Sequence, residues 1–140
     1  MNKVFIDTDV VLDLFVRREP HHEEALRLFT CLKRSETGIY TSPLVVANTY
    51  YILAKLKDKR YASDRIKKLR KLIKIAPVDQ TTIDAALESP CRDFEDSIQF
   101  QCARKNGIQL LLTRNTKDYP RSDIKVANPG QYLQTAGQAV

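Results

Sequence analysis

The sequence contains little of what several classes of protein require. Its 140 residues include only four glycines, three cysteines and no tryptophan. The glycines are dispersed, so none belongs to a loop that could cradle the phosphates of a nucleotide. Cys31, Cys91 and Cys102 are odd in number and widely spaced, which fits neither a disulfide framework nor a zinc motif. We therefore expect free thiols and a reducing compartment, the cytoplasm.

Long hydrophobic runs are also missing. No stretch of 18 apolar residues occurs, so we expect no membrane span. The chain opens on a strand-like segment followed by acids, which is atypical of a signal peptide. A hydrophobic fraction of 43% in 140 residues is sufficient for one core. We expect a single domain over residues 1–134 and a small, polar, frayed tail at 135–140.

Positive charge is in excess and unevenly placed. The net charge is +6, and the basic residues between Lys55 and Lys74 far outnumber the two acids there, Asp58 and Asp64. Such a segment attracts a polyanion such as RNA. It is equally well explained as the solvated face of a helix.

Short apolar segments alternate with one or two helical segments along the whole chain. The strand-like segments are 3–6, 38–41, 73–76, 109–113 and 124–126. Helical periodicity and capping residues predict helices over 10–15, 21–35, 44–57, 62–72, 79–87, 93–106 and 129–134. This alternation requires crossover connections between parallel strands. We predict an α/β fold, a three-layer α/β/α sandwich with a central parallel sheet of four to five strands.

Acidic residues lie beside two of the predicted strands. Asp7 directly follows the first strand, while Asp96 lies on the helix before the strand at 109–113 and Asp118 in the loop after it. Asp93 and Asp96 are three residues apart and therefore share a helix face. Ligands of parallel sheets bind at the carboxyl ends of strands, where carboxylates can hold Mg²⁺ or Mn²⁺. These four acids are the candidates for a metal-dependent hydrolytic site.

Each acid also has a purely structural interpretation. Asp7 or Asp9 could cap the following helix, and the sequence favours Asp9 as the cap. Asp93 and Asp96 could be first-turn acids that only complement the helix dipole. Asp118 could be an ordinary turn residue.

Asn48 is an unusual residue for the apolar side of a helix. Asn is a poor helix-interior residue and must be hydrogen-bonded if it is buried. It could hold a backbone group in the core, or it could face the acidic cluster.

The order and spacing of these motifs resemble those of PIN domains. The resemblance extends from Lys3 to about Leu133, and the segment 42–51 is similar to a branch with Asn in place of Glu on the third helix. The motifs are Val4-Phe5-Ile6-Asp7-Thr8-Asp9-Val10, Asp93-Phe94-Glu95-Asp96-Ser97-Ile98-Gln99 and Leu111-Leu112-Thr113-Arg114-Asn115.

The resemblance implies a Mg²⁺- or Mn²⁺-dependent endoribonuclease of VapC-like type. Many such proteins are toxins that form homodimers and are held inactive by a small antitoxin protein. Asp7 corresponds to the first catalytic acid and Asp96 to the third, so these two are the expected metal ligands. The second and fourth family acids correspond to Asn48 and Asn115, which are neutral.

Several further side chains have expected roles around this site. The leading hypothesis is metal-dependent cleavage of RNA. The two neutral residues motivate an alternative, a PIN-fold nucleic-acid-binding module with weakened catalysis, for which the basic stretch from Lys55 to Lys74 would supply affinity. A third hypothesis is a toxin-like fold that acts only as a protein partner. For the enzyme, we expect Asp93 and Asp118 to restore missing charge, Thr8, Asn48, Thr113 and Asn115 to support the site, and Arg114 and Lys117 to contact nucleic acid.

Overall fold

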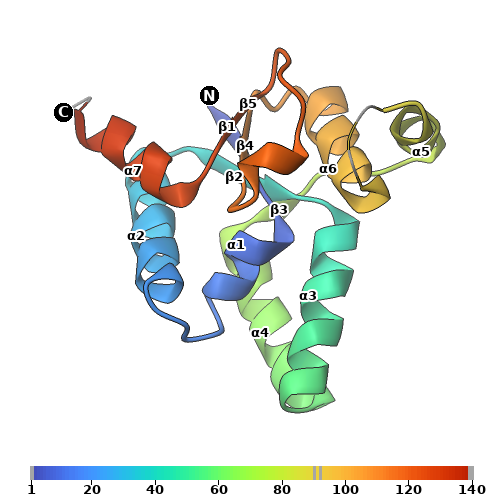
Figure 1. Ribbon diagram of the computed structural model, residues 1–140. Coiled ribbons are helices and arrows are strands. Elements are labelled where there is room, and N and C mark those ends of the chain that lie inside the picture. Colours follow the sequence, from blue (N-terminus) through green and yellow to red (C-terminus); the bar gives the residue numbers. More distant parts are fainter. Residues whose placement is uncertain (1, 90, 92, 139–140) are drawn as a thin grey trace.

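Five short strands form one parallel sheet at the centre of the molecule (Figure 1). The computed structural model describes residues 2–89, 91 and 93–138. Every neighbouring pair in the order β3-β2-β1-β4-β5 is parallel, which confirms the predicted fold class. The strands are β1 (Lys3–Ile6), β2 (Gly38–Thr41), β3 (Lys74–Ile75), β4 (Leu110–Leu112) and β5 (Lys125–Ala127).

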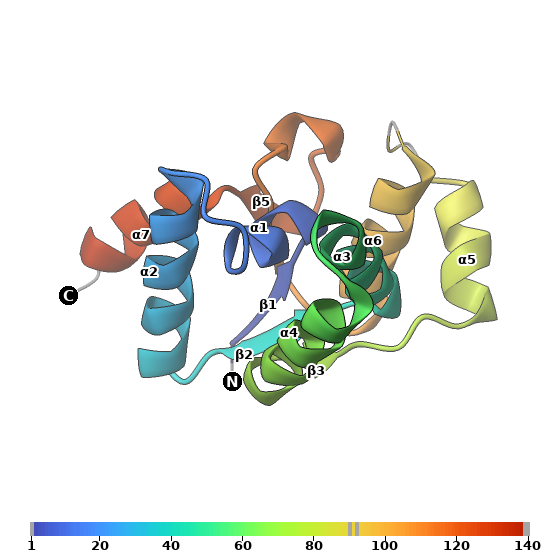
Figure 2. The same ribbon diagram turned by 90° about the horizontal axis from the view of Figure 1, so that it is seen from below.

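Helices flank the sheet on both sides. In Figures 1 and 2, α2 and α7 lie together at one side, α5 and α6 lie together at the other, and the pair α3 and α4 projects from the body. Within the described residues the helices are α1 (Thr8–Asp13), α2 (His21–Arg34), α3 (Pro43–Leu56), α4 (Lys59–Leu72), α5 (Gln80–Leu87), α6 (Phe94–Lys105), the 3-10 helix η1 (Thr116–Asp118) and α7 (Pro129–Gln138).

Side-chain caps mark the first residue of several helices, and the starts of α1 and α4 differ from the prediction. The Asp7 carboxylate accepts a hydrogen bond from the Thr8 N–H, so α1 begins at Thr8. The preference for Asp9 as the cap is therefore wrong. The helix expected from residue 62 begins at Lys59, because Asp58 accepts from the backbone of its first turn.

The end of the chain also differs from the prediction. The terminal helix, expected to stop at Gln134, continues to Gln138. Much of the segment expected to be frayed is therefore helical, while residues 139–140 lie outside the described part of the chain. No helix in the described ranges is both long and apolar enough to cross a lipid bilayer.

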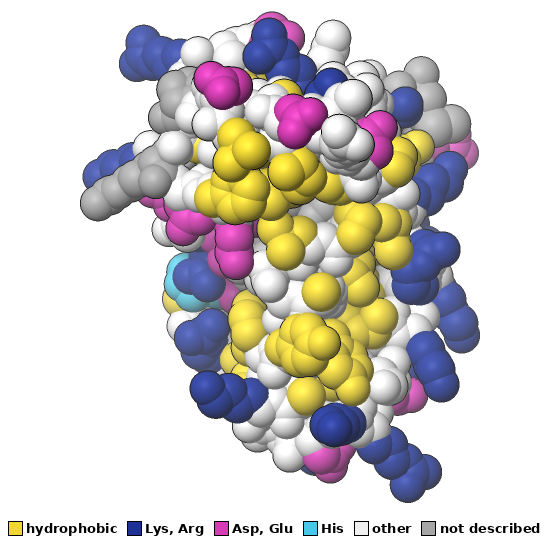
Figure 3. Space-filling model, turned by 90° about the vertical axis from the view of Figure 1, so that its right-hand side faces the viewer, with side chains coloured by type: hydrophobic (Ala, Val, Ile, Leu, Met, Phe, Trp, Pro, Cys, Tyr) yellow, Lys and Arg dark blue, Asp and Glu magenta, His cyan; other side chains and the backbone are white. Residues whose placement is uncertain are grey.

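One side of the molecule exposes an extended hydrophobic surface. Figure 3 views the side on which α3 and α5 lie in Figure 1, and hydrophobic side chains form a broad band across it. Apolar surface of this extent is uncommon on monomeric proteins and typically marks an interaction site. We call this surface the α3–α5 face; the exposed large hydrophobic residues of α3, α5 and α6 are Tyr51, Ile52, Leu56, Leu87 and Phe94.

Candidate active site

The order of the strands reverses between β1 and β4. The chain adds β2 and β3 on one side of β1, and then β4 and β5 on the other. Connections diverge at such a switch point and leave a crevice at the carboxyl ends of the two strands. Ile6 lies opposite Leu112, and the Asp7 N–H donates to the Leu112 carbonyl at 3.0 Å. Asp7 and Thr113 therefore leave the sheet side by side.

Asp7 is buried and surrounded by neutral donors. Its Oδ2 accepts from Thr113 Oγ1 and from Tyr119 Oη, both at 2.9 Å, and its Oδ1 accepts from the Thr8 N–H at 2.7 Å. Burial raises the pKa of Asp7, and these hydrogen bonds oppose the rise. Within the described residues no Lys or Arg forms an ion pair with this carboxylate.

Asp96 reaches the same point from α6. Tyr119 Oη lies 3.4 Å from Asp96 Oδ1 as well as 2.9 Å from Asp7 Oδ2, so one hydroxyl bridges the two carboxylates. Burial and the charges of Asp7, Asp93 and Asp118 raise the pKa of Asp96 to about 7. Several acids are thus crowded at one place, and no Lys or Arg of the described residues forms an ion pair with Asp7 or Asp96, an arrangement typical of functional sites.

Tyr119 is a site residue that the sequence analysis missed. It is 8% exposed, and burial together with the charge of Asp7 raises its pKa. A tyrosine in a loop carries no signal of its direction. The only available hint is its position directly after Asp118, in the turn that follows a strand ending at the crevice.

Asp9 is a second residue that the sequence analysis missed. Its Oδ2 accepts from the Arg114 N–H at 3.0 Å and from the Asn115 side-chain amide at 3.2 Å, and Thr113 Oγ1 is 3.4 Å away. Burial and the charge of Asp7 raise its pKa to about 6. Its Oδ1 is buried and has no hydrogen-bond partner among the described residues. The recognisable signal was two acids separated by one residue at a strand end.

The segment after β4 carries five of the predicted site residues: Thr113, Arg114, Asn115, Lys117 and Asp118. Asn115 directs its amide at Asp9, as a supporting residue would. Asp118 is half-buried, and its charge raises the pKa of Asp7 and of Asp96. Lys117 is exposed in η1.

Two predicted residues, Thr8 and Asp93, lie at the starts of helices beside the site. Asp93 is exposed and caps α6, where its Oδ1 accepts from the Glu95 N–H at 2.8 Å. Thr8 contributes its backbone N–H to Asp7, and the described residues give its hydroxyl no hydrogen bond. Capping thus accounts for the position of Asp93, although its charge still acts on Asp96.

Asn48 belongs to α3 and contacts α6. Its side-chain amide donates to Glu95 Oε2 at 3.5 Å, and Asn48 is half-buried. The two helices are also joined by a buried hydrogen bond from Ser42 Oγ to Gln99 Oε1. The contact of Asn48 therefore bridges two helices that border the crevice.

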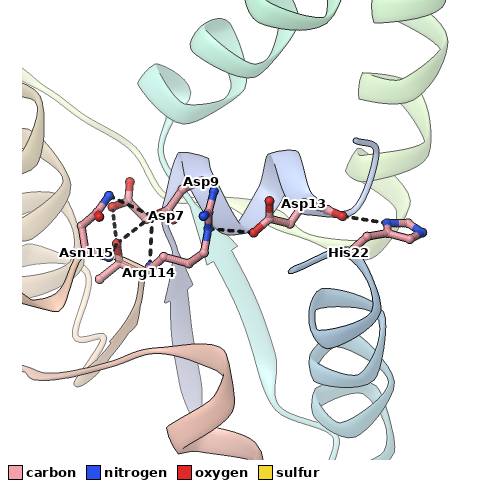
Figure 4. A network of polar contacts seen from close by, with 7 residues as sticks. Asp7, Asp9, Asp13, His22, Arg114 and Asn115 are labelled. Atoms are coloured by element: carbon pink, nitrogen blue, oxygen red, sulfur yellow. Dashed lines mark hydrogen bonds and ion pairs between the residues drawn. The ribbon is translucent and has the colours of Figure 1, made fainter. Parts of the chain in front are cut away.

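Arg114 directs its side chain along α1 (Figure 4). Its Nε lies 2.9 Å from Asp13 Oδ2, and the Asp13 side chain is only 2% exposed. The guanidinium is therefore engaged in an ion pair inside the protein. The Arg114 side chain is 29% exposed beyond this ion pair, so the expected contact with nucleic acid stays a prediction.

The donor set is compatible with a hard divalent cation. In the part of the chain that the structure describes, no three His, Cys, Asp or Glu side chains converge closely enough to enclose an ion. Mg²⁺ commonly keeps several waters and takes one or two carboxylates, so Asp7 and Asp96 suffice. A cation or its bound water would relieve the crowding of the acids and provide a partner for the buried Oδ1 of Asp9.

Comparison with known sequences gives one consistent family. Residues 3–117 match the family model described as PIN domain. Ribonuclease VapC1 of Aquifex aeolicus (strain VF5) is 28% identical over 137 residues, which are 94% of this chain and 94% of that protein.

Solved structures share the fold. The crystal structure of Mycobacterium tuberculosis VapC20, a sarcin–ricin loop cleaving toxin, has a TM-score of 0.62 and 23% identity, and the match covers 77% of this chain and 86% of that one. A toxin–antitoxin complex from Klebsiella pneumoniae has a TM-score of 0.65 and 21% identity, over 90% of this chain and 97% of that one.

Proposed function

The chain belongs to the PIN domain family, and from this premise we propose that it is a metal-dependent endoribonuclease and the toxin of a toxin–antitoxin pair. One observation carries the proposal: Asp7 and Asp96, far apart in the sequence, share the hydroxyl of Tyr119 at the switch point of the sheet. The Aquifex relative is named a ribonuclease, and the Klebsiella structure is a toxin–antitoxin complex, which supports both parts.

In this proposal Asp7 and Asp96 hold Mg²⁺ or Mn²⁺. When bound, the ion would polarise a phosphoryl oxygen and lower the pKa of its water. Thr113 and Tyr119 fix the orientation of Asp7 by donating to its Oδ2. Asp118, half-buried beside both ligands, is placed to accept a proton from the attacking water.

The neutral Asn48 and Asn115 do not leave the site short of negative charge. Asn115 supports Asp9, whose carboxylate lies in the same cluster as Asp7. We propose that Asp9 and Asp118 together supply the charge that the two amides lack. We would expect the two amides to weaken cleavage only if neither Asp9 nor Asp118 faced the crevice.

The test is cleavage of single-stranded RNA with Mn²⁺, comparing wild type with the double variant Asp7→Asn plus Asp96→Asn. The double variant lacks the two carboxylates that are proposed to hold the ion, so we expect cleavage to fall to background. Asp84→Asn, which changes an exposed acid of α5, is the matched control and should cleave like wild type. Equal rates for wild type and the double variant would end the proposal.

A binding module without catalysis is the second candidate, and the exposed basic side chains of α4 favour it. Lys59, Arg60, Lys67, Lys68 and Lys71 are all exposed. Calorimetric titration with Mn²⁺ separates the two candidates. Metal binding that disappears in Asp7→Asn supports the enzyme, whereas salt-sensitive RNA binding with no metal requirement supports the module.

A groove between α2 and α4 is the surface that we propose for the antitoxin. Its volume is about 500 Å³, and Leu26 and Leu72 in its lining are exposed. Lys33, Lys71 and Lys74 also line it, against a single acid, Glu36. An amphipathic segment with apolar side chains on one face and acids beside them would complement this lining.

The α3–α5 face is the surface that we propose for a second copy of the chain. The large exposed side chains that define it are uncharged, in a molecule whose net charge is +6. Two copies would otherwise repel one another, so an uncharged, self-complementary surface is the one best suited to a symmetric pair.

A further inference from the structure

Asp13 and Arg114 form a charged pair that the catalytic proposal does not use. Asp13 is at the end of α1 with a side chain 2% exposed, and Arg114 Nε lies 2.9 Å from its Oδ2. A carboxylate is costly to remove from water unless it is paired. Burial raises the pKa of Asp13, and the nearby charge of Arg114 opposes the rise. Asp13 Oδ1, the second carboxylate oxygen, is buried and has no hydrogen-bond partner among the described residues.

Arg114 also contacts α1 a second time, one turn nearer the site. Its backbone N–H donates to Asp9 Oδ2 at 3.0 Å. Asp9 and Asp13 are four residues apart and therefore share one face of α1. Figure 4 shows the resulting row of contacts, which continues to α2 through His22 Nδ1 and the Asp13 carbonyl at 2.8 Å.

The turn held by these contacts supplies donors to two of the clustered acids. Thr113 Oγ1 donates to Asp7, and both Arg114 and Asn115 donate to Asp9. Three consecutive residues thus set the positions of two carboxylates. If the turn moved away from α1, all three donors would be displaced together.

We infer that Arg114 is a positioning residue, and that its ion pair with Asp13 fixes the 113–115 turn against α1 so that Asp7 and Asp9 are correctly placed. The inference rests on the proposed nuclease function. It differs from a contact between Arg114 and a phosphate of the RNA. A phosphate contact acts on substrate binding and involves Arg114 alone, whereas a positioning pair requires both partners and acts on turnover.

The experiment compares Arg114→Met, Asp13→Asn and the double variant with wild type. Arg114→Met removes the ion-pair partner of a buried carboxylate, and this variant can fail to fold. The double variant removes both charges and avoids that problem. Arg104→Met and Asp123→Asn are the matched controls, because this exposed ion pair, with an N···O distance of 3.8 Å, lies on the surface.

Two measurements are made on each variant. Amide hydrogen exchange is followed at Arg114 and Asn115, and RNA cleavage with Mn²⁺ is resolved into kcat and KM. We expect exchange at these amides to be about tenfold faster or more in the double variant, because the N–H groups lose their fixed acceptors. We expect kcat to fall by about tenfold or more in Arg114→Met and in Asp13→Asn, with little change in KM. The kcat of the double variant should be no lower than that of the worse single variant. The control pair should match wild type.

The failure of this inference can be distinguished from that of the nuclease proposal. Exchange in the double variant that matches wild type overturns the positioning role, whether or not the protein cleaves RNA. A raised KM with unchanged kcat in Arg114→Met, without any effect of Asp13→Asn, also overturns it in favour of a phosphate contact. A wild-type protein that neither binds Mn²⁺ nor cleaves RNA refutes the nuclease, while faster exchange in the double variant still upholds the role of the pair in holding the turn.

Discussion

At the scale of single residues, the hydrogen bonds to the carboxylates of the crevice come from neutral donors. Asp7 accepts from two hydroxyl groups and one backbone N–H, and Asp9 accepts from a backbone N–H and an amide. The Arg114 guanidinium pairs with Asp13, and among the described residues no Lys or Arg forms an ion pair with Asp7, Asp9 or Asp96. The acids therefore keep their mutual repulsion, and their protonation should respond to pH and to metal.

The pH dependence of stability should show this repulsion. The pKa of Asp96 is raised from 3.8 to about 7 in the folded protein, so the folded state binds the proton more tightly than the unfolded chain. The protonated Asp96 therefore stabilises the folded state fully below about pH 4, and this contribution is lost as the pH rises through about 7. We expect the Tm of the metal-free protein to fall as the pH rises across this window. In Asp96→Asn, Tm should fall less over the same range.

The Tm of wild type and of Asp96→Asn is measured by thermal unfolding of the metal-free proteins between pH 4 and 8. Asp84→Asn is the control, since this exposed acid of α5 has no resolved interaction with the cluster. An Asp96→Asn variant whose Tm follows pH as steeply as that of wild type would contradict the assignment of the raised pKa to Asp96.

Removing the bridging hydroxyl should destabilise the protein. Tyr119→Phe keeps the buried ring and deletes the donor to Asp7 and Asp96. A hydrogen bond to a charged group contributes roughly 1.5–3 kcal/mol, so we expect a loss of about that size in urea unfolding. Tyr50→Phe, on half-buried Tyr50 of α3, should change the free energy of unfolding by much less. Comparable losses in both variants would show that the bridge has no special role.

At the scale of the elements, the crevice is shaped by how the helices begin. Ser42 caps α3 and also donates to Gln99 of α6, so a single hydroxyl starts one helix and joins it to another. Gln99 is 1% exposed and has little access to water as a substitute partner. This contact joins the start of α3 to α6, the helix that carries Asp96.

Ser42→Ala should therefore cost more than the loss of an ordinary cap. A helix cap contributes about 1 kcal/mol, and an unsatisfied buried acceptor adds about 1–3 kcal/mol. We expect a loss of about 2–4 kcal/mol in denaturant unfolding for Ser42→Ala. Asp58→Ala removes an exposed cap from α4 and should lose only about 1 kcal/mol. Equal losses would mean that the bond to Gln99 does not stabilise the fold.

At the scale of the whole molecule, two apolar surfaces have different surroundings. The α3–α5 face is built from large uncharged side chains, whereas the groove between α2 and α4 is lined by three lysines as well as apolar residues. Charge therefore distinguishes a surface suited to a second copy from a surface suited to an acidic partner.

Substitutions on the two surfaces should separate their roles. Tyr51→Glu with Leu87→Glu places like charges on the α3–α5 face, so we expect the mass measured by light scattering to fall from dimer to monomer. Leu26→Glu with Leu72→Glu alters the groove and should leave the mass unchanged. A wild-type protein that is monomeric at high concentration, or a dimer unaffected by the first pair, would contradict the assignment.

The fold could be predicted from the sequence because its signals are local. Short apolar segments separated by helical periodicity require parallel strands with crossovers, and Ser42-Pro43 marks the start of α3 by its own chemistry. Asp7 was recognisable as a site residue because it ends the first strand, and the carboxyl ends of parallel strands meet at one edge. These features depend on residues adjacent in the chain.

The tertiary structure alone decided which side chains meet at that edge. Tyr119 bridges Asp7 and Asp96, Asp9 accepts hydrogen bonds from the turn after β4 although it resembled a helix cap, and Arg114 pairs with Asp13. Each depends on the direction of a side chain and on the approach of segments up to about a hundred residues apart. Local periodicity fixes neither quantity, because both are set by how the helices pack on the sheet.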